Sequence, residues 1–163
     1  MNKNEQKLIK NEQKSLKIKN MCFLVLILAA NFLFSQEIER INSTEHLSKN
    51  YPFSEATIIG NVIYLSGEIG TLPNGKLIEG GITAQTKQAL TNIKNTLEEI
   101  GSSIDNVFKC TCMLSDINDY GEMNKEYIKH FKRDKMPSRS TFAASGLALN
   151  AKLEIECIAI KNK

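Results

Sequence analysis

The fold is decided by the stretch LEIECIAI, from Leu153 to Ile160, which is the most regular strand pattern in the chain. Because successive strand residues face opposite sides of a sheet, Leu153 and every second residue up to position 159 share one apolar face. Glu154 and Glu156 share the other face with Ile158 and Ile160, and the two glutamates lie about 7 Å apart. We therefore expect a strand that covers a core with one face and carries two carboxylates on the other.

A second informative stretch is PSRST, residues 137–141, in which Arg139 follows a proline turn and precedes a run of strand character up to Ala143. A guanidinium binds a carboxylate through two parallel hydrogen bonds, and its charge is permanent. If the fold brings Arg139 beside Glu154 and Glu156, the three side chains would form an anion clamp next to an acid/base group. The alternative is a cross-strand salt bridge with no functional role.

The region before these strands contains the pattern of a hairpin. Apolar runs at 56–59 and 62–65 flank the two-residue turn Gly60-Asn61, and a second turn is predicted at Pro73-Asn74-Gly75. Gly80-Gly81 ends this β portion.

The helical signals follow. Apolar residues at three- and four-residue spacing predict a helix over 83–100 that stops at Gly101. A strand is expected over 104–114, and Asp119 with Glu122 predicts a capping box for a second helix, whose apolar stripe contains Met123, Tyr127 and Phe131. Strands followed by helix–strand–helix–strand–strand indicate an α+β fold, a mixed sheet with both helices packed on one face.

The N-terminal segment has the layout of a secretory signal peptide over residues 1–35. A lysine-rich stretch precedes the apolar run at 21–34, and Ser35 and Gln36 give a small-residue exit. The run would span only about 21 Å of a bilayer core of about 30 Å, so we expect export and cleavage near Ser35. The alternatives are an uncleaved anchor and a cytoplasmic protein with a buried N-terminal helix. Residues 36–50 are predicted to be a loose polar lead-in, and residues 51–163 the folded domain.

Composition narrows the functional classes. The chain has 21 basic and 18 acidic residues, but residues 1–35 hold six Lys and two Glu, so the remainder carries 15 basic and 16 acidic groups. We therefore expect no nucleic-acid partner and no stable membrane association after signal cleavage. The protein is expected to be periplasmic or secreted, or cytoplasmic if the signal does not function.

The cysteines and histidines do not predict a metal or disulfide site. Cys110 and Cys112 are expected to be small buried residues on one strand face with Phe108 and Leu114. Without the leader three cysteines remain, an odd count that predicts no disulfide framework. The two histidines do not have zinc-ligand spacing to the cysteines, so no metal is expected.

An ordered set of short motifs between Tyr51 and Lys161 resembles the Rid/YjgF family, the reactive imine and enamine deaminases. The motifs are YPFSEA (51–56), YLSGEIG (64–70), GGI (80–82) with QTKQALTN (85–92), VFKCT (107–111) with DINDY (116–120), MNKEY (123–127), PSRST (137–141) and EIECIA (154–159). Each motif is weak alone, and their order is specific.

The resemblance implies a fold related to that of bacterial chorismate mutase and a homotrimer with ligand sites in clefts between subunits. It implies hydrolysis of 2-imino or enamine acids, such as 2-aminoacrylate, to 2-keto acids and ammonia without a cofactor. Arg139 corresponds to the family's carboxylate-binding arginine and Glu154 to the glutamate that positions or activates water.

Further substrate-binding positions follow from the same resemblance. They are Phe53, Ser66, Gly67, Asn124 and Thr141, where Ser66 and Gly67 match the segment whose backbone approaches the ligand and Thr141 matches a position that offers its main-chain carbonyl. Asn124 and Tyr127 match a helical pair at the cleft edge, although Tyr127 is equally explained as a core residue.

Three departures from the family pattern affect the expected substrate range. Phe53 replaces a tyrosine, Glu68 replaces a glutamine and adds negative charge near the pocket, and the loop LALN at 147–150 lacks a proline. With the predicted export, these departures favour an alternative: a non-enzymatic trimer that binds small carboxylates in its inter-subunit clefts. A third hypothesis is an interaction protein whose cleft is incidental.

Overall fold

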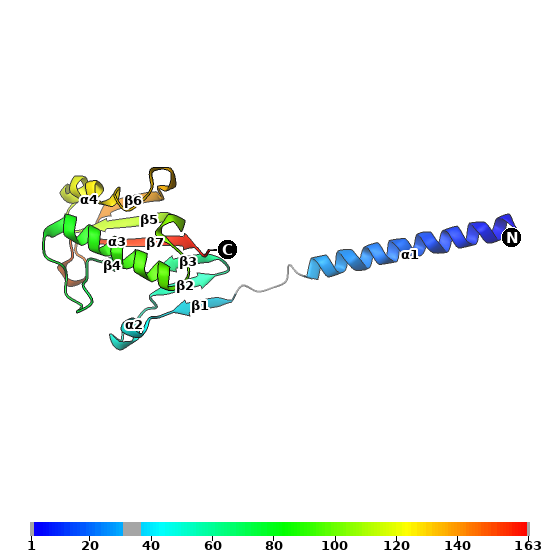
Figure 1. Ribbon diagram of the computed structural model, residues 1–163, viewed down its shortest axis with the longest axis horizontal. Coiled ribbons are helices and arrows are strands. Elements are labelled where there is room, and N and C mark those ends of the chain that lie inside the picture. Colours follow the sequence, from blue (N-terminus) through cyan, green and yellow to red (C-terminus); the bar gives the residue numbers. More distant parts are fainter. Residues whose placement is uncertain (1, 31–36, 163) are drawn as a thin grey trace. The chain divides into compact units, whose positions relative to one another are not determined.

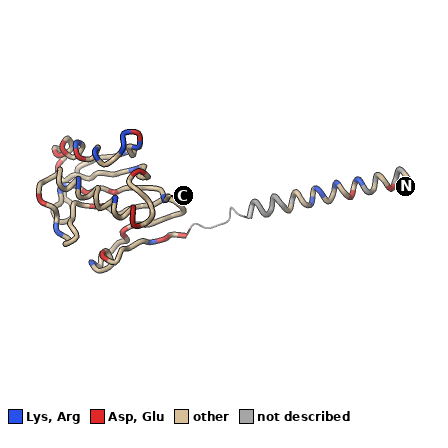
Figure 2. The backbone as a smooth tube through the Cα atoms, in the orientation of Figure 1, with Lys and Arg blue, Asp and Glu red and all other residues tan. Residues whose placement is uncertain are grey.

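The computed structural model describes residues 2–30 and 37–162. The chain divides into two compact units, Met1–Gln36 and Glu37–Lys163. In the first unit, helix α1 spans Lys3–Ala30. Figure 2 shows its described basic residues spaced along the helix. Among the described residues, no helix is both long and apolar enough to cross a membrane. Residues 31–36, where the signal cleavage site is predicted, lie outside the described part, so the signal peptide stays a prediction.

The second unit is built on one mixed sheet. Its strands are β1 (Ile38–Ile41), β2 (Ala56–Ile59), β3 (Val62–Leu65), β4 (Glu68–Ile69), β5 (Val107–Leu114), β6 (Ser138–Ala143) and β7 (Leu153–Ile160). The order is β1-β2-β3-β7-β5-β6, with β4 also paired to β7. Strand β6 runs parallel to β5, and the other neighbours pair antiparallel.

Helices cover one face of this sheet. Helix α3 (Gly81–Glu99) lies across the strands, and α4 (Tyr120–Tyr127) packs beside α3 over the β5–β6 side, as Figure 1 shows. The remaining helices are short: α2 (Thr44–Ser48), η1 (Ile104–Asn106), η2 (Ile117–Asp119), η3 (Arg133–Lys135) and η4 (Ala148–Asn150). The core between helices and sheet contains the fully buried Ile63, Leu90, Ile93, Leu97, Leu114, Met123, Leu153 and Ile155. The predicted α+β fold with a mixed sheet and two helices on one face is confirmed.

Strand β7 is the organising element. Leu153, Ile155, Cys157 and Ala159 are all fully buried, whereas Glu154 and Ile158 are half-buried and Glu156 is exposed. The predicted alternation is therefore confirmed. Because β7 pairs with β3, β4 and β5, its apolar face forms the centre of the core.

The predicted helix end at Gly101 is also confirmed. Gly101 has a φ of 78°, its N–H donates to Glu98 O, and the N–H of Ser102 donates to Leu97 O at 2.7 Å. This is the Schellman arrangement, in which a left-handed residue turns the chain and satisfies the last helical carbonyls. The turn positions the start of β5 against the C-terminal end of β7.

The polar lead-in prediction for residues 36–50 is wrong where the structure describes that segment. Ile38 to Ile41 form β1, which pairs with β2, and Ser43 caps helix α2 by accepting a hydrogen bond from His46 N at 3.2 Å. Glu55 fixes the segment, because its carboxylate accepts from Ser43 N at 2.8 Å and from Thr96 Oγ1 at 3.3 Å. The compact unit therefore begins before residue 51, the predicted domain start.

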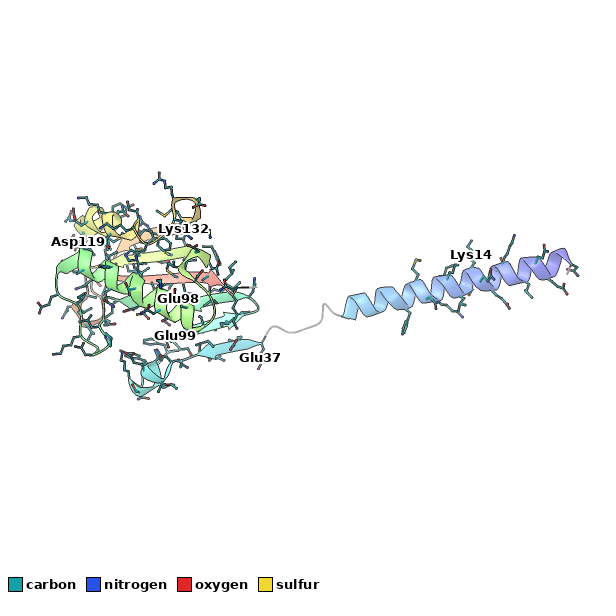
Figure 3. All side chains as sticks on the ribbon, viewed as in Figure 1. Lys14, Glu37, Glu98, Glu99, Asp119 and Lys132 are labelled. Carbon is teal, nitrogen blue, oxygen red and sulfur yellow. The ribbon has the colours of Figure 1, made fainter. Side chains whose placement is uncertain are left out.

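Two local predictions also fail. Phe108 was expected on the buried face of β5 but is 47% exposed, because a bulge between Val107 and Lys109 shifts the register. The Asp119–Glu122 capping box does not form. Asp119, labelled in Figure 3, instead accepts a hydrogen bond from Lys152 Nζ at 3.2 Å, and Glu122 pairs with Lys125.

Candidate functional site

Arg139 lies on the helix-covered face of β6, against two tyrosines of α4. Its guanidinium carbon is 4.5 Å from the centre of the Tyr127 ring and 5.7 Å from that of Tyr120. Arg139 Nη2 donates to Tyr120 OH at 3.3 Å. The aromatic faces hold the guanidinium through cation–π attraction and leave most of its N–H groups for a ligand. A shallow cleft of about 480 Å³ opens here between α4 and the start of β6.

Unpaired polar atoms surround this arginine. Within the described residues, the buried Asn124 Oδ1, Tyr127 OH and Thr141 Oγ1 have no oxygen or nitrogen hydrogen-bond partner, and only the weakly accepting thiols of Cys110 and Cys112 interact with the latter two. Asn124 and Tyr127 line the same cleft as Arg139, and Thr141 is two residues further along the same face of β6. Buried polar atoms without partners are costly and rare in native proteins, so three near one cation favour a polar ligand at this position. The predicted residues Arg139, Asn124 and Thr141 therefore lie in one region.

Glu154 occupies the other face of the sheet, directly over Gly67. A Cβ atom on Gly67 would lie 1.9 Å from Glu154 Oε1, so only glycine leaves room for this carboxylate. The neighbouring Ser66 is fixed as well, because its Oγ donates to Ser54 O at 2.7 Å and its N–H to Glu55 O. The predicted residues Ser66, Gly67 and Glu154 are thus in contact or adjacent.

An irregularity in the sheet creates this close approach. Tyr64 pairs with Ile158 and Glu68 pairs with Ile155, so residues 65–67 oppose only residues 156 and 157 of β7. The extra residue re-aims the backbone between β3 and β4, as a β-bulge does. The backbone of Ser66 and Gly67 is thereby presented beside the Glu154 carboxylate.

Arg139 and Glu154 are not brought together within one chain. Arg139 pairs in register with Cys110, which is fully buried under the helices, whereas Glu154 pairs with Met113 on the opposite face. Side chains of paired residues share a face, so the β5 strand and the thickness of the sheet separate the two groups. The expected clamp and the alternative cross-strand salt bridge are both wrong within the described single chain. Glu156 instead accepts a weak bond from Thr111 Oγ1 at 3.4 Å.

The Glu154 side opens into a larger cleft of about 880 Å³. Its wall contains several glutamates from distant parts of the sequence: Glu45, Glu55, Glu68, Glu99 and Glu154. Lys49, also in the wall, is engaged by Glu45 at 2.6 Å. The described residues contain no group of three or more His, Cys, Asp or Glu arranged to hold a metal ion. The cleft is therefore acidic, which suits proton transfer and repels additional anions.

Burial changes the acidity of two of these carboxyls. Burial raises the pKa of Glu154 above its usual value, and the negative charge of Glu156 raises it further. Burial together with the charge of Glu55 raises the pKa of Glu68 to about 7, although Lys49 acts in the opposite direction. Carboxyls whose pKa is raised toward neutrality can both donate and accept a proton.

The rim of the acidic cleft is aromatic and comes from the N-terminal part of the unit. Phe53 stacks on Tyr51 with ring centres 5.2 Å apart, and His46 contacts both rings edge-on. The carbonyl oxygen of Phe53 accepts a hydrogen bond from His46 Nε2 at 2.7 Å, which fixes the loop. Phe53, predicted to line the site without a hydroxyl, is 51% exposed at this rim.

The loop that lacks the family's proline also reaches this cleft. Ala148 and Leu149 are part of its wall, and Leu149 has a φ of 55°. A non-glycine residue in the left-handed region is uncommon, and such conformations concentrate near functional sites.

Sequence analysis missed several residues of the two clefts. Tyr120 was noted only as part of a motif, although its hydroxyl contacts Arg139. His46, Lys49 and Tyr51 are not among the predicted site residues, and the first two lie in the segment that is predicted to be a loose lead-in. The N-cap pattern at Ser43 was the available signal for helix α2.

Residues 43–161 match the family described as Endoribonuclease L-PSP. Protein HMF1 of Saccharomyces cerevisiae is 43% identical over 107 residues, which cover 66% of this chain and 82% of that protein. The human 2-iminobutanoate/2-iminopropanoate deaminase is 38% identical over 111 residues, covering 68% of this chain and 80% of the human protein.

Solved structures give the same result for the fold. The structure of YyfA from Yersinia pestis, a protein of unknown function in the conserved Rid protein family, superposes with a TM-score of 0.71 at 34% identity, covering 76% of this chain and 99% of YyfA. TdcF of E. coli with bound serine has a TM-score of 0.63 at 27% identity, covering 69% of this chain and 90% of TdcF. The fold of the second unit is therefore that of Rid and YjgF proteins.

Proposed function

The chain belongs to the Endoribonuclease L-PSP family, which contains the Rid and YjgF proteins, and we propose that it hydrolyses reactive 2-imino and enamine acids, such as 2-aminoacrylate, to 2-keto acids and ammonia. The observation that carries this proposal is the pair of half-sites. One offers Arg139 among buried polar atoms without partners, and the other offers a Glu154 carboxyl of raised pKa over Gly67. The human relative that is 38% identical to this chain is named for this activity, as a 2-iminobutanoate/2-iminopropanoate deaminase.

In the proposed mechanism, Arg139 binds the substrate carboxylate through two N–H groups. An enamine first takes a proton at its terminal carbon, which the protonated form of Glu154 donates, and becomes the imine. Ionised Glu154 then accepts a proton from water as the water oxygen attacks the imine carbon. That proton then passes from Glu154 to nitrogen. As the C–N bond breaks, Glu154 accepts the hydroxyl proton of the intermediate, so that ammonia and the 2-keto acid leave and Glu154 is protonated again.

The two half-sites require two copies of the chain. Arg139 and Glu154 lie on opposite faces of one sheet, so a substrate can reach both only where the Arg139 face of one copy meets the Glu154 face of another. We propose that this arrangement closes as a homotrimer, because a heterologous contact of this kind must close into a ring or extend as a filament. The half-buried and exposed apolar side chains on the open face of the sheet, including Tyr64, Ile160 and Phe142, suit contact with another copy.

The alternative proposal is an exported trimer that binds small carboxylates at Arg139 without turning them over. The aromatic rim without a Phe53 hydroxyl favours this alternative, because one hydrogen bond to substrate or water is lost. The name of the family suggests RNA cleavage, but the glutamates lining the Glu154 cleft would repel a phosphodiester. The predicted signal peptide is part of both proposals, and N-terminal sequencing of protein from fractionated cells tests its cleavage near Ser35.

The decisive assay uses the full chain and 2-aminoacrylate generated in situ by a serine dehydratase. We expect the wild type to accelerate the appearance of pyruvate, and neither Arg139→Ala nor Glu154→Gln to do so. If neither the wild type nor the variants accelerate the reaction, but the wild type binds 2-ketobutyrate in a titration, the result favours the carboxylate-binding trimer instead.

Mixing the two inactive variants tests the shared site. If Arg139 and Glu154 of one site come from different copies, random reassembly after denaturation leaves about one quarter of the sites with both groups intact. Activity of the mixture near that fraction of wild type supports the inter-copy site. A mixture as inactive as its components contradicts it.

A further inference from the structure

Three buried cysteines lie beneath the Arg139 cleft, outside the residues that the proposed reaction uses. Cys110 and Cys112 are on β5, Cys157 is on β7, and all three side chains are fully buried as free thiols. They face the helices, on the same side of the sheet as Arg139. Cys110 pairs in register with Arg139 on one side and with Cys157 on the other, so the three residues form one row across the sheet.

Cys110 and Cys157 are positioned for a covalent bond. Directly opposed residues of antiparallel strands have Cα atoms about 4.5–5.5 Å apart, inside the range of about 4.4–6.8 Å that disulfides require. The two Sγ atoms are already 3.0 Å apart. A movement of about 1 Å would bring them to the bond length of a disulfide.

Cys112 is a natural control within the same strand. It pairs in register with Ile155, so no thiol opposes it. A disulfide at Cys112 is thus disfavoured by the geometry of the folded sheet.

We propose that Cys110 and Cys157 form an intramolecular disulfide that joins the two central strands of the sheet directly beneath the Arg139 cleft. This inference does not depend on the proposed catalytic function.

The oxidant is a disulfide compound such as glutathione disulfide. The thiolate of either cysteine, written here for Cys110, attacks one of its sulfurs, forms a mixed disulfide and releases one glutathione thiolate. The Cys157 thiolate then attacks Cys110 Sγ, the mixed disulfide breaks, and the second glutathione leaves. Two cysteine thiols lose two protons and two electrons, and one glutathione disulfide becomes two thiols. Because both thiols are buried in the folded unit, the exchange takes place before the sheet and helices close.

The test is to refold the full chain in a glutathione redox buffer, block free thiols under denaturing conditions and map the tryptic peptides. We expect the peptide of residues 153–161 to be linked to the peptide of residues 110–125 before reduction. Since the second peptide contains both Cys110 and Cys112, the same map of Cys112→Ala assigns the partner. The link should persist in Cys112→Ala and disappear in Cys110→Ala.

Thermal unfolding gives a second readout that does not depend on the folding of Cys110→Ala. The bond would close a loop of 47 residues, and loop-closure entropy predicts that oxidised Cys112→Ala melts about 10 °C above its reduced form. The proposal is overturned if peptide 153–161 of the oxidised wild type is recovered with a blocked thiol. It is equally overturned if that peptide is linked through Cys112.

Discussion

The Arg139 cleft and the Glu154 cleft differ in charge. The Arg139 cleft opens between α4 and the start of β6 and holds a permanent cation against the ring of Tyr127. The Glu154 cleft lies beside the β3–β4 irregularity and contains glutamates from five positions, two of them with a raised pKa. Each is one half of a site: the first is suited to hold a carboxylate, and the second to move protons.

The difference explains why one chain separates its charges. Had Arg139 and Glu154 met on one face, they would have neutralised each other as a salt bridge, and the pKa of Glu154 would have fallen. On opposite faces, Arg139 keeps its N–H groups for a ligand, and burial raises the pKa of Glu154. Conventional ion pairs occur elsewhere in this unit. Lys132, labelled in Figure 3, contacts Asp105 together with Lys135, and Figure 2 shows charges of both signs interspersed over this unit.

The largest expected effect is the loss of the cation. Arg139→Ala should lower kcat/KM for 2-aminoacrylate by about 1,000-fold, because truncating one partner of a hydrogen-bonded charge pair costs about 2–5 kcal/mol. Arg139→Lys keeps the charge without the bidentate geometry and should recover only part of the loss. The exposed Arg133→Ala is the control and should behave as wild type. If the Arg139 and Arg133 substitutions have equal effects on kcat/KM, the Arg139 cleft has no special role in substrate binding.

Loss of the proton-transfer group should have the next largest effect. Glu154→Gln should reduce kcat by about 100-fold, the usual contribution of a general acid/base, without lowering the Tm. Glu156→Gln is the matched control, because Glu156 is exposed two residues away on the same face. It should leave the maximal rate intact but shift the limb of the kcat–pH profile that Glu154 governs to lower pH, since the charge of Glu156 helps to raise the pKa of Glu154. An unchanged profile would contradict this coupling.

A smaller effect is expected from crowding the Glu154 carboxylate. In Gly67→Ala the new Cβ would overlap Glu154 Oε1, so the side chain must rotate away. We expect a loss of about 10-fold in kcat at nearly unchanged stability, because displacing a positioned group slows the reaction while Glu154 can move into the cleft. Gly121→Ala is the control, because nothing lies within 4 Å of the added atom. If both variants keep full activity, the position of Glu154 over Gly67 does not contribute to catalysis.

The smallest effect concerns Glu68 and pH. Its folded pKa of about 7 lies above the ordinary value of 4.5, so the folded state binds the proton more tightly. The stabilisation is therefore fully present below about pH 4.5 and is lost as pH rises to about 7, at most about 3 kcal/mol. Glu68→Gln should raise the Tm at pH 8 but not at pH 4.5, measured by thermal unfolding. The exposed Glu79→Gln should show no such difference.

The same substitution tests the acidic character of the Glu154 cleft. At pH 8, where Glu68 is mostly ionised, Glu68→Gln removes its negative charge and should increase the rate for an imino acid with an acidic side chain several-fold relative to 2-aminoacrylate. An unchanged ratio would mean that the substrate side chain does not enter this cleft.

Local patterns predicted the fold well where a single periodicity was strong. The alternation of β7, the hairpin around Gly60-Asn61 and the C-terminal end of α3 at Gly101 are all as expected. The predictions failed where a contact between distant parts of the sequence determines the local structure. The strand β1 exists because β2 offers an open edge, and Asp119 pairs with Lys152 rather than capping α4. The sequence around Phe108 does not predict the bulge that exposes this side chain.

By itself, the sequence determined the α+β order of elements, the apolar face of β7 and the identity of Arg139 and Glu154 as candidate groups, because these follow from side-chain chemistry and from periodicities of two and 3.6 residues. Only the tertiary structure decided that the two groups lie on opposite faces, that Gly67 makes room for Glu154, and that Cys110 opposes Cys157. Those facts depend on strand order and register, and these are set by the packing of the whole core, to which distant segments contribute together.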